Sequence, residues 1–164
     1  MDDPLFDLVR NQLLEVLDRK FLGPMKSIYC YRPAGLAKGR YSPAREFLDG
    51  LSTSAAARYR HHFETRCSGL FLRHNKWHGW EQKNKRCYDI YGYKDIESKS
   101  RVVHITDRWK VDILLFGFGG KNENDVEEVH VLRAISLRNE YTRRRDALAA
   151  GLAASQKRDT RWKR

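Results

Sequence analysis

The first segment of the chain, residues 3–22, carries apolar residues four positions apart. They fall on one face of a helix: Leu5, Val9, Leu13 and Leu17. Asp3 is a candidate N-cap, and Pro4 occupies the first helical position, where proline is favoured. Gly23 and Pro24 end the pattern, and a short β-rich run follows at 26–31. The sequence therefore predicts an amphipathic helix and then a first strand.

Two further helices are predicted between residues 42 and 67. Ser42 is the candidate cap of the first, with Pro43 at its first position and Phe47 and Leu48 directed inward. The second begins after Ser52 and repeats small and apolar residues every three or four positions: Ala55, Ala56, Tyr59, Phe63 and Cys67. The short connection between them predicts an antiparallel helical hairpin.

Three β-type runs separated by polar turns occupy the middle of the chain, at 87–93, 101–106 and 111–117. They predict an antiparallel meander. The polar segment before them, 70–85, is predicted to be mainly loop. A final helix is expected to start at Asn124 or Asp125, to be interrupted at Arg143–Arg145 and to continue to Ser155.

The predicted order of elements defines an α+β fold. One sheet of about four antiparallel strands is combined with a helical hairpin, an extra helix at 1–24 and a closing helix. Residues 1–156 are expected to form a single domain, because 164 residues fit one hydrophobic core. Residues 157–164 are basic without an apolar face and are predicted to be a flexible tail.

The positive net charge of the chain predicts a polyanionic partner. The chain holds 32 Lys and Arg against 21 Asp and Glu, for a net charge of +11, which suits nucleic acid, an anionic membrane surface or an acidic protein partner. Its three cysteines form no C-x-x-C pair, so neither a zinc framework nor another cofactor is expected. The acidic start and the lack of a long apolar run predict a cytoplasmic protein that is neither exported nor bound to a membrane.

Three stretches within residues 41–141 carry a family resemblance. SPAREFL at 42–48 opens the helical hairpin, and CYDI at 87–90 is followed by RVVHI at 101–105 on the neighbouring strand. ILLFGFGGK at 113–121 is a hydrophobic strand that ends in a glycine-lysine turn. In order and spacing these stretches resemble the RelE/ParE toxin superfamily, especially its HigB-like and phage Gp49-like members.

The resemblance implies a RelE-like fold and a function. Such a protein is the toxin of a type II toxin-antitoxin system: it is neutralised by an antitoxin protein, and in the RelE and HigB branches it enters the ribosome and cleaves messenger RNA. Its partners would be mRNA, the ribosomal RNA and the antitoxin. The ParE branch instead inhibits DNA gyrase. The oligomeric state stays open.

Metal-free RNA cleavage requires groups that transfer protons and cations that stabilise charge on the phosphorane. On the family pattern the candidates are Arg101, His104 and Lys121. Positions three apart on a strand point to opposite faces unless a bulge intervenes, so Arg101 and His104 are not expected to line one face together. A half-buried sheet histidine is the simpler interpretation of His104.

The loop before the meander mixes basic and aromatic residues, the combination that contacts phosphates and stacks on bases. The candidate RNA-binding residues are Arg73, His74, Lys76, Trp77, His78, Trp80, Lys83, Lys85 and Arg86. His74 and His78 lie four apart, but no cysteine or acid completes a metal site, so no metal is predicted.

The sequence departs from the family pattern on one strand. Many RelE-like ribonucleases carry basic residues where this chain has Tyr88-Asp89-Ile90-Tyr91. Two alternatives to the ribonuclease therefore stay open: a noncatalytic member of the fold that binds nucleic acid or protein, and a ParE-like gyrase inhibitor.

Overall fold

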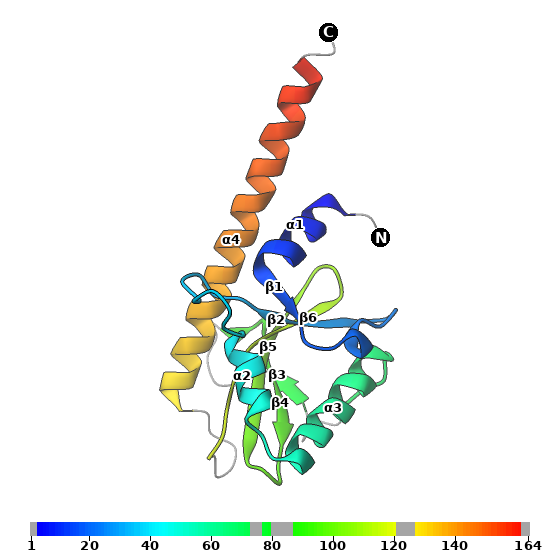
Figure 1. Cartoon of the computed structure of the whole chain (residues 1–164), viewed down its shortest axis with the longest axis vertical. Coiled ribbons are helices and arrows are strands. Elements are labelled where there is room, and N and C mark those ends of the chain that lie inside the picture. Colours follow the sequence, from blue (N-terminus) through cyan, green and yellow to red (C-terminus); the bar gives the residue numbers. More distant parts are fainter. Residues whose placement is uncertain (1–2, 73–76, 80–86, 121–126, 162–164) are drawn as a thin grey trace.

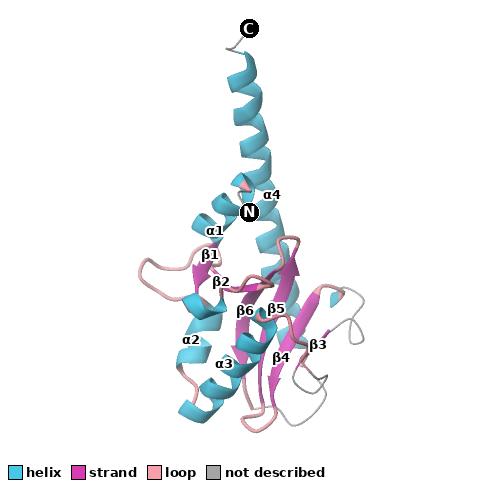
Figure 2. Cartoon of the chain, turned by 90° about the vertical axis from the view of Figure 1, so that its right-hand side faces the viewer, coloured by secondary structure: helices cyan, strands magenta, loops and turns pink. Residues whose placement is uncertain are grey.

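A six-stranded sheet forms the centre of the computed structural model, which describes residues 3–72, 77–79, 87–120 and 127–161. The strands lie in the order β1-β2-β6-β5-β4-β3 (Figures 1 and 2). Their bounds are Leu14–Val16 for β1, Ser27–Tyr31 for β2, Trp77–Gly79 for β3, Ile90–Asp95 for β4, Ser100–Asp107 for β5 and Val111–Phe118 for β6. β2 and β6 run parallel, and the other neighbours run antiparallel.

The predicted α+β class and the antiparallel meander β4-β5-β6 are confirmed. Two features of the sheet differ from the prediction. It is mixed, because β2 pairs in parallel with β6 across a long stretch of sequence, which no local pattern reveals. It also gains β1 and β3, each only three residues long, and β3 lies in the segment 70–85 that was predicted to be loop.

Among the described residues, four α-helices and one short 3₁₀ helix accompany the sheet. The bounds are Pro4–Leu13 for α1, Arg19–Phe21 for the 3₁₀ helix η1, Pro43–Asp49 for α2, Thr53–Cys67 for α3 and Glu128–Arg161 for α4. The predicted caps Asp3 and Ser42 are present, and Ser52 caps α3: each accepts a backbone N–H group of the first turn.

The first helix is shorter than the predicted segment 3–22. It ends at Leu13, and the chain turns directly into β1, where Leu14 pairs with Tyr31 of β2. Leu14 is thereby buried on the sheet edge, so tertiary pairing overrides the helical periodicity that continues to Leu17.

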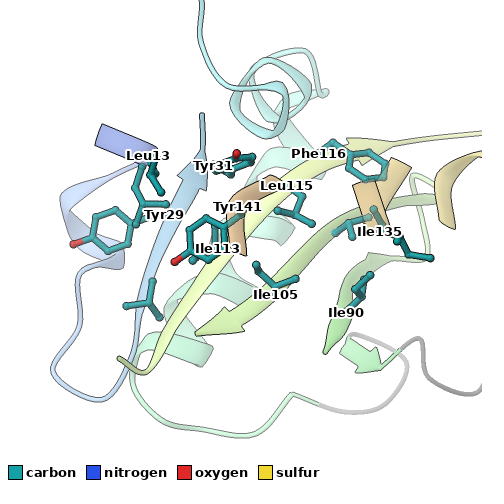
Figure 3. Packing of buried hydrophobic residues seen from close by; sticks show 14 of the residues in the cluster. Leu13, Tyr29, Tyr31, Ile90, Ile105, Ile113, Leu115, Phe116, Ile135 and Tyr141 are labelled. Atoms are coloured by element: carbon teal, nitrogen blue, oxygen red, sulfur yellow. The ribbon is translucent and has the colours of Figure 1, made fainter. Parts of the chain in front are cut away.

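The helices cover both faces of the sheet and create two hydrophobic clusters. On the α1–α4 face, side chains of α1 and α4 pack on residues such as Ile105, Ile113 and Leu115 (Figure 3). On the α2–α3 face, α2, α3 and η1 pack on Val102 and Leu114. Strand alternation sends successive residues of β5 to opposite faces, and those of β6 likewise except at Leu115 and Phe116, which both belong to the α1–α4 cluster.

A β-bulge lies between β5 and β6, and the strand that carries it determines whether Arg101 and His104 share a face of the sheet. Val103 pairs with Phe116 and His104 pairs with Leu114, so Leu115 is one extra residue in β6. The bulge lies in β6, and β5 alternates without interruption. Arg101 and His104 therefore leave the sheet on opposite faces, as the spacing predicted.

Helix α4 is 34 residues long and projects beyond the rest of the molecule (Figures 1 and 2). It begins at Glu128, later than predicted, and it is not interrupted at Arg143–Arg145. Arg144 and Arg145 are fixed to the body instead, by hydrogen bonds to the Tyr31 hydroxyl and to the Asp107 carboxylate. Residues 157–161 of the predicted flexible tail continue the helix.

Candidate functional site

A buried carboxylate organises the α2–α3 face. Asp112, the second residue of β6, is fully buried, and both of its oxygens are occupied. Oδ1 accepts hydrogen bonds from Lys26 Nζ at 2.8 Å and Thr106 Oγ1 at 2.7 Å. Oδ2 accepts from Arg66 Nε at 3.0 Å and the Tyr93 hydroxyl at 2.8 Å. We call these five residues the Asp112 network.

Five different elements or connections bring the network together. Lys26 precedes β2, Arg66 lies in the last turn of α3, and Tyr93, Thr106 and Asp112 belong to β4, β5 and β6. The parallel pairing of β2 with β6 puts the start of β2 beside Asp112, because Ile28 is its register partner. The network therefore ties the sheet to the end of α3.

His104 adjoins this network without a route to solvent. Its side chain is completely buried, and its Nδ1 lies 3.9 Å from Asp112 Oδ1. The ring stacks on Tyr93 with centroids 4.5 Å apart and on Tyr91 with centroids 5.5 Å apart. Burial lowers the pKa of His104 to about 4, so the ring is neutral at pH 7.

The charges of the network stabilise one another. Burial alone raises the pKa of Asp112, but the electrostatic interaction with His104 and the positive charges of Lys26 and Arg66 outweigh it and leave the pKa well below 3.8. The Lys26 and Arg66 side chains are 15% and 19% exposed, so both cations reach the surface at their edges. The arrangement is that of a structural anchor, and the burial of His104 keeps it away from a bound substrate.

A second group of charged residues lies on the α1–α4 face, around Lys94 and Arg101. These two cations are register partners on β4 and β5, and Arg101 is in turn paired with Phe118 on β6. Directly paired residues share one face of a sheet, so all three side chains leave the same face. We call this group the Lys94–Arg101 site.

Burial and the neighbouring charge of Arg101 both act on Lys94. Burial lowers the pKa of Lys94, and the positive charge of Arg101 lowers it further. Burial also lowers the pKa of Arg101. In the part of the chain that the structure describes, no carboxylate lies within ion-pair distance of the Lys94 amine. Two adjacent, partly desolvated cations are electrostatically suited to an anionic ligand.

Aromatic rings border the same site. His130, near the start of α4, stacks on Phe118 with ring centroids 3.9 Å apart and planes inclined by 10°. Arg133, one turn further along α4, lies over the Phe116 ring with its Cζ atom 4.4 Å from the ring centroid. The exposed Arg133 therefore adds a third cation near the aromatic rim of the site.

The structure describes only some of the predicted site residues. Arg101 and His104 are separated by the sheet, and Lys121 lies outside the described residues. Trp77 and His78 belong to the edge strand β3, whose backbone pairs with β4. The other predicted RNA-binding residues also fall outside the described part: Arg73, His74, Lys76, Trp80, Lys83, Lys85 and Arg86.

Sequence reasoning missed the Asp112 network and Lys94. One signal for Asp112 was available: it is the only acid in the apolar run VDILLFGF of β6, and an acid in a central strand requires partners. Lys94 could not be identified, because its pairing with Arg101 depends on the register of β4 against β5.

Within the described residues, no three His, Cys, Asp or Glu side chains are grouped as a metal ion would need. No helix among them combines the length and apolar character required to cross a membrane. Comparison of the chain with protein-family models, curated proteins and solved structures found no match.

Proposed function

We propose that this protein is a RelE-like toxin of a type II toxin-antitoxin system that acts in the cytoplasm on ribosome-bound mRNA. The observation that carries the proposal is the order of elements. Strand β2 is followed by the helix pair α2 and α3, then by the meander β4-β5-β6 and a closing helix. This is the order on which the sequence resemblance rests, and the net charge of +11 favours RNA as the partner.

In this proposal the RNA backbone binds at the Lys94–Arg101 site. The half-buried Lys94 would contact a phosphate, with the charge of Arg101, which is 6% exposed, directly beside it, and the rings of Phe118 and His130 border the two cations. A phosphate would also place a negative charge beside Lys94, whose pKa is lowered by burial and by the positive charge of Arg101.

The proposed reaction is an attack of the ribose 2′-oxygen on the adjacent phosphorus, which expels the 5′-oxygen and leaves a 2′,3′-cyclic phosphate. A base must take the 2′-hydroxyl proton, and an acid must protonate the leaving 5′-oxygen. Arg101 is assigned to stabilise the phosphorane charge. Lys94, whose pKa is lowered by burial and by Arg101, is assigned to proton transfer, and His104 is not.

The test is inducible expression in a bacterium with mapping of transcript 5′-ends. The wild-type chain is expected to arrest growth and to create new codon-phased ends in translated messages. Arg101→Ala should reduce the rate of cleavage by about 10² to 10³, the usual loss when one charge-stabilising donor is removed. Arg60→Ala, which removes an exposed arginine from α3, is the matched control and should cleave normally. Growth arrest without new ends would refute the ribonuclease.

The burial of His104 favours a second candidate, a noncatalytic RNA-binding protein of the same fold. A noncatalytic protein of this kind should leave growth normal and messages intact, while its RNA binding should still depend on Arg101. The salt dependence of single-stranded RNA binding measures this directly. Loss of one phosphate contact in Arg101→Ala should lower the slope of log K against log salt by about 0.7.

A further inference from the structure

A pocket on the α2–α3 side has a floor that suits one aromatic ring. It opens between η1, α2 and α3, and its volume is about 150 Å³. Its three aromatic lining residues, Phe21, Tyr59 and Phe63, are almost fully buried and are called its floor, and the rings of Phe21 and Phe63 meet edge to face with centroids 5.4 Å apart. Apolar cavities of about this size are known to accept a benzene ring.

The rim of the pocket is acidic, in contrast with the strongly basic chain. Asp18 and Asp49 line it together with a single cation, Arg60. The Asp49 side chain is 58% exposed and lies 3.6 Å from Arg45 Nε, while Asp18 accepts the Lys20 N–H at the start of η1. Both carboxylates keep lone pairs that can accept from a ligand. The chemistry of the pocket fits an aromatic side chain flanked by cations.

The chain itself contains a segment of this kind. Residues 157–164, KRDTRWKR, hold five cations, one carboxylate and a single aromatic residue, Trp162. Tryptophan and arginine are the residues that most often dominate the energy of protein interfaces. The helix leading to this segment makes its last packing contacts with the core at Leu152, and residues 153–158 are exposed.

A single molecule cannot place Trp162 in its own pocket. Trp162 directly follows Arg161, the last residue of α4, and consecutive Cα atoms are only about 3.8 Å apart. The end of α4 and the helices α2 and α3 lie at opposite ends of the molecule in both views (Figures 1 and 2). Only the pocket of a second molecule is within reach.

We propose that the 157–164 segment of one copy docks into this pocket of a second copy. Trp162 enters the aromatic floor, and the flanking arginine and lysine side chains pair with Asp18 and Asp49. The contact joins two different surfaces, so it is heterologous and builds either a closed ring or an open chain. It does not depend on the proposed action on RNA.

The test is sedimentation velocity of the full chain, freed of nucleic acid, over a range of protein concentrations. The wild-type chain is expected to assemble as concentration rises. Ala56→Leu places a larger side chain in the pocket, and Trp162→Ala removes the docking ring. Each should weaken assembly at least about 30-fold, the effect of losing an interface residue that dominates binding. Ala57→Leu, on the exposed side of α3, and Thr160→Ala are the matched controls and should assemble normally.

A mixing experiment separates docking from misfolding. The Trp162→Ala protein keeps an intact pocket, and the Ala56→Leu protein keeps an intact segment, so a mixture of the two should form a heterodimer that does not grow further. A wild-type chain that stays monomeric at every concentration would overturn the proposal. So would assembly that persists in Trp162→Ala, or two variants that fail to pair when they are mixed.

Discussion

Both faces of the sheet hold fully buried residues, but the two faces are stabilised by different chemistry. Asp112 and Ile113 are neighbours on β6, and both are fully buried. On the α1–α4 face Ile113 meets other aliphatic and aromatic side chains, whereas on the α2–α3 face Asp112 meets two cations and two hydroxyl groups. The comparison shows that burial alone does not tell how a position stabilises the fold.

The difference lies in how each face responds to a change. Apolar contacts are numerous and individually weak, so the α1–α4 face should lose stability gradually as methyl groups are removed. The Asp112 network is saturated, with two partners on each carboxylate oxygen. Removal of one member leaves the others buried without compensation.

The largest effect is expected for Asp112→Ala. The substitution leaves Lys26 and Arg66 next to each other and largely buried without the charge that neutralises them. The free energy of unfolding should fall by about 3 to 5 kcal/mol, the usual cost of breaking a buried ion pair. Urea denaturation of the two proteins at pH 7 measures it.

A double-mutant cycle identifies the cause of that loss. Lys26→Met in the Asp112→Ala background removes one of the stranded cations and should recover part of the stability. In the wild-type background the same change should destabilise the protein. If the two losses simply add, Asp112 and Lys26 are not energetically coupled and the network interpretation fails.

The second effect is a dependence on pH that comes from His104. Its folded-state pKa of about 4 lies below the ordinary value of 6.5, so between these values the unfolded chain binds a proton that the folded protein does not. The contribution of His104 to the free energy of unfolding is therefore fully present above pH 6.5. It falls as the pH is lowered toward 4, by about 3 kcal/mol in total. Urea titrations at a series of pH values give this slope.

His104→Phe is the variant that tests the assignment, because phenylalanine can take the place of the ring between Tyr91 and Tyr93. It should remove the pH dependence between 6.5 and 4. A further but smaller loss below pH 4 should remain, because Lys26 and Arg66 still lower the folded-state pKa of Asp112, while the contribution of His104 to that shift is gone. An unchanged slope in this variant would exclude His104 as its source.

On the opposite face, Ile113→Val should have a smaller effect. One buried methyl group is lost from the α1–α4 cluster, and the free energy of unfolding should fall by about 0.5 to 1.5 kcal/mol. The same urea experiment applies, and the change should be independent of pH between 4 and 7. A loss as large as that of Asp112→Ala would erase the contrast between the two faces.

The sequence predicted those elements that are determined by interactions between residues close together along the chain. The caps Asp3 and Ser42 and the meander were identified correctly, because side-chain capping and alternation depend on residues close together in the sequence. The strand β1 was predicted as helix, because its pairing with β2 is not visible in the chain around it. The parallel pairing of β2 with β6 was missed for the same reason.

The site was less predictable than the fold. Spacing correctly indicated that Arg101 and His104 occupy opposite faces, because alternation is a local property. The burial of His104, its approach to Asp112 and the pairing of Lys94 with Arg101 depend on strand register and on the end of α3. Such contacts join residues far apart in sequence, and one sequence contains no direct record of them.

The smallest effect is expected from removing the end of α4, far from both faces. A chain shortened after Gln156 loses residues 157–164 and none of the contacts of the two clusters. Its free energy of unfolding should stay within about 0.5 kcal/mol of the full chain, because exposed positions away from packed features contribute little. The measurement must be made at a dilution where the full chain is monomeric, since assembly would add its own stabilisation. A loss above about 1 kcal/mol in the monomer would show that residues 157–164 stabilise the body of the same molecule, in conflict with docking only between copies.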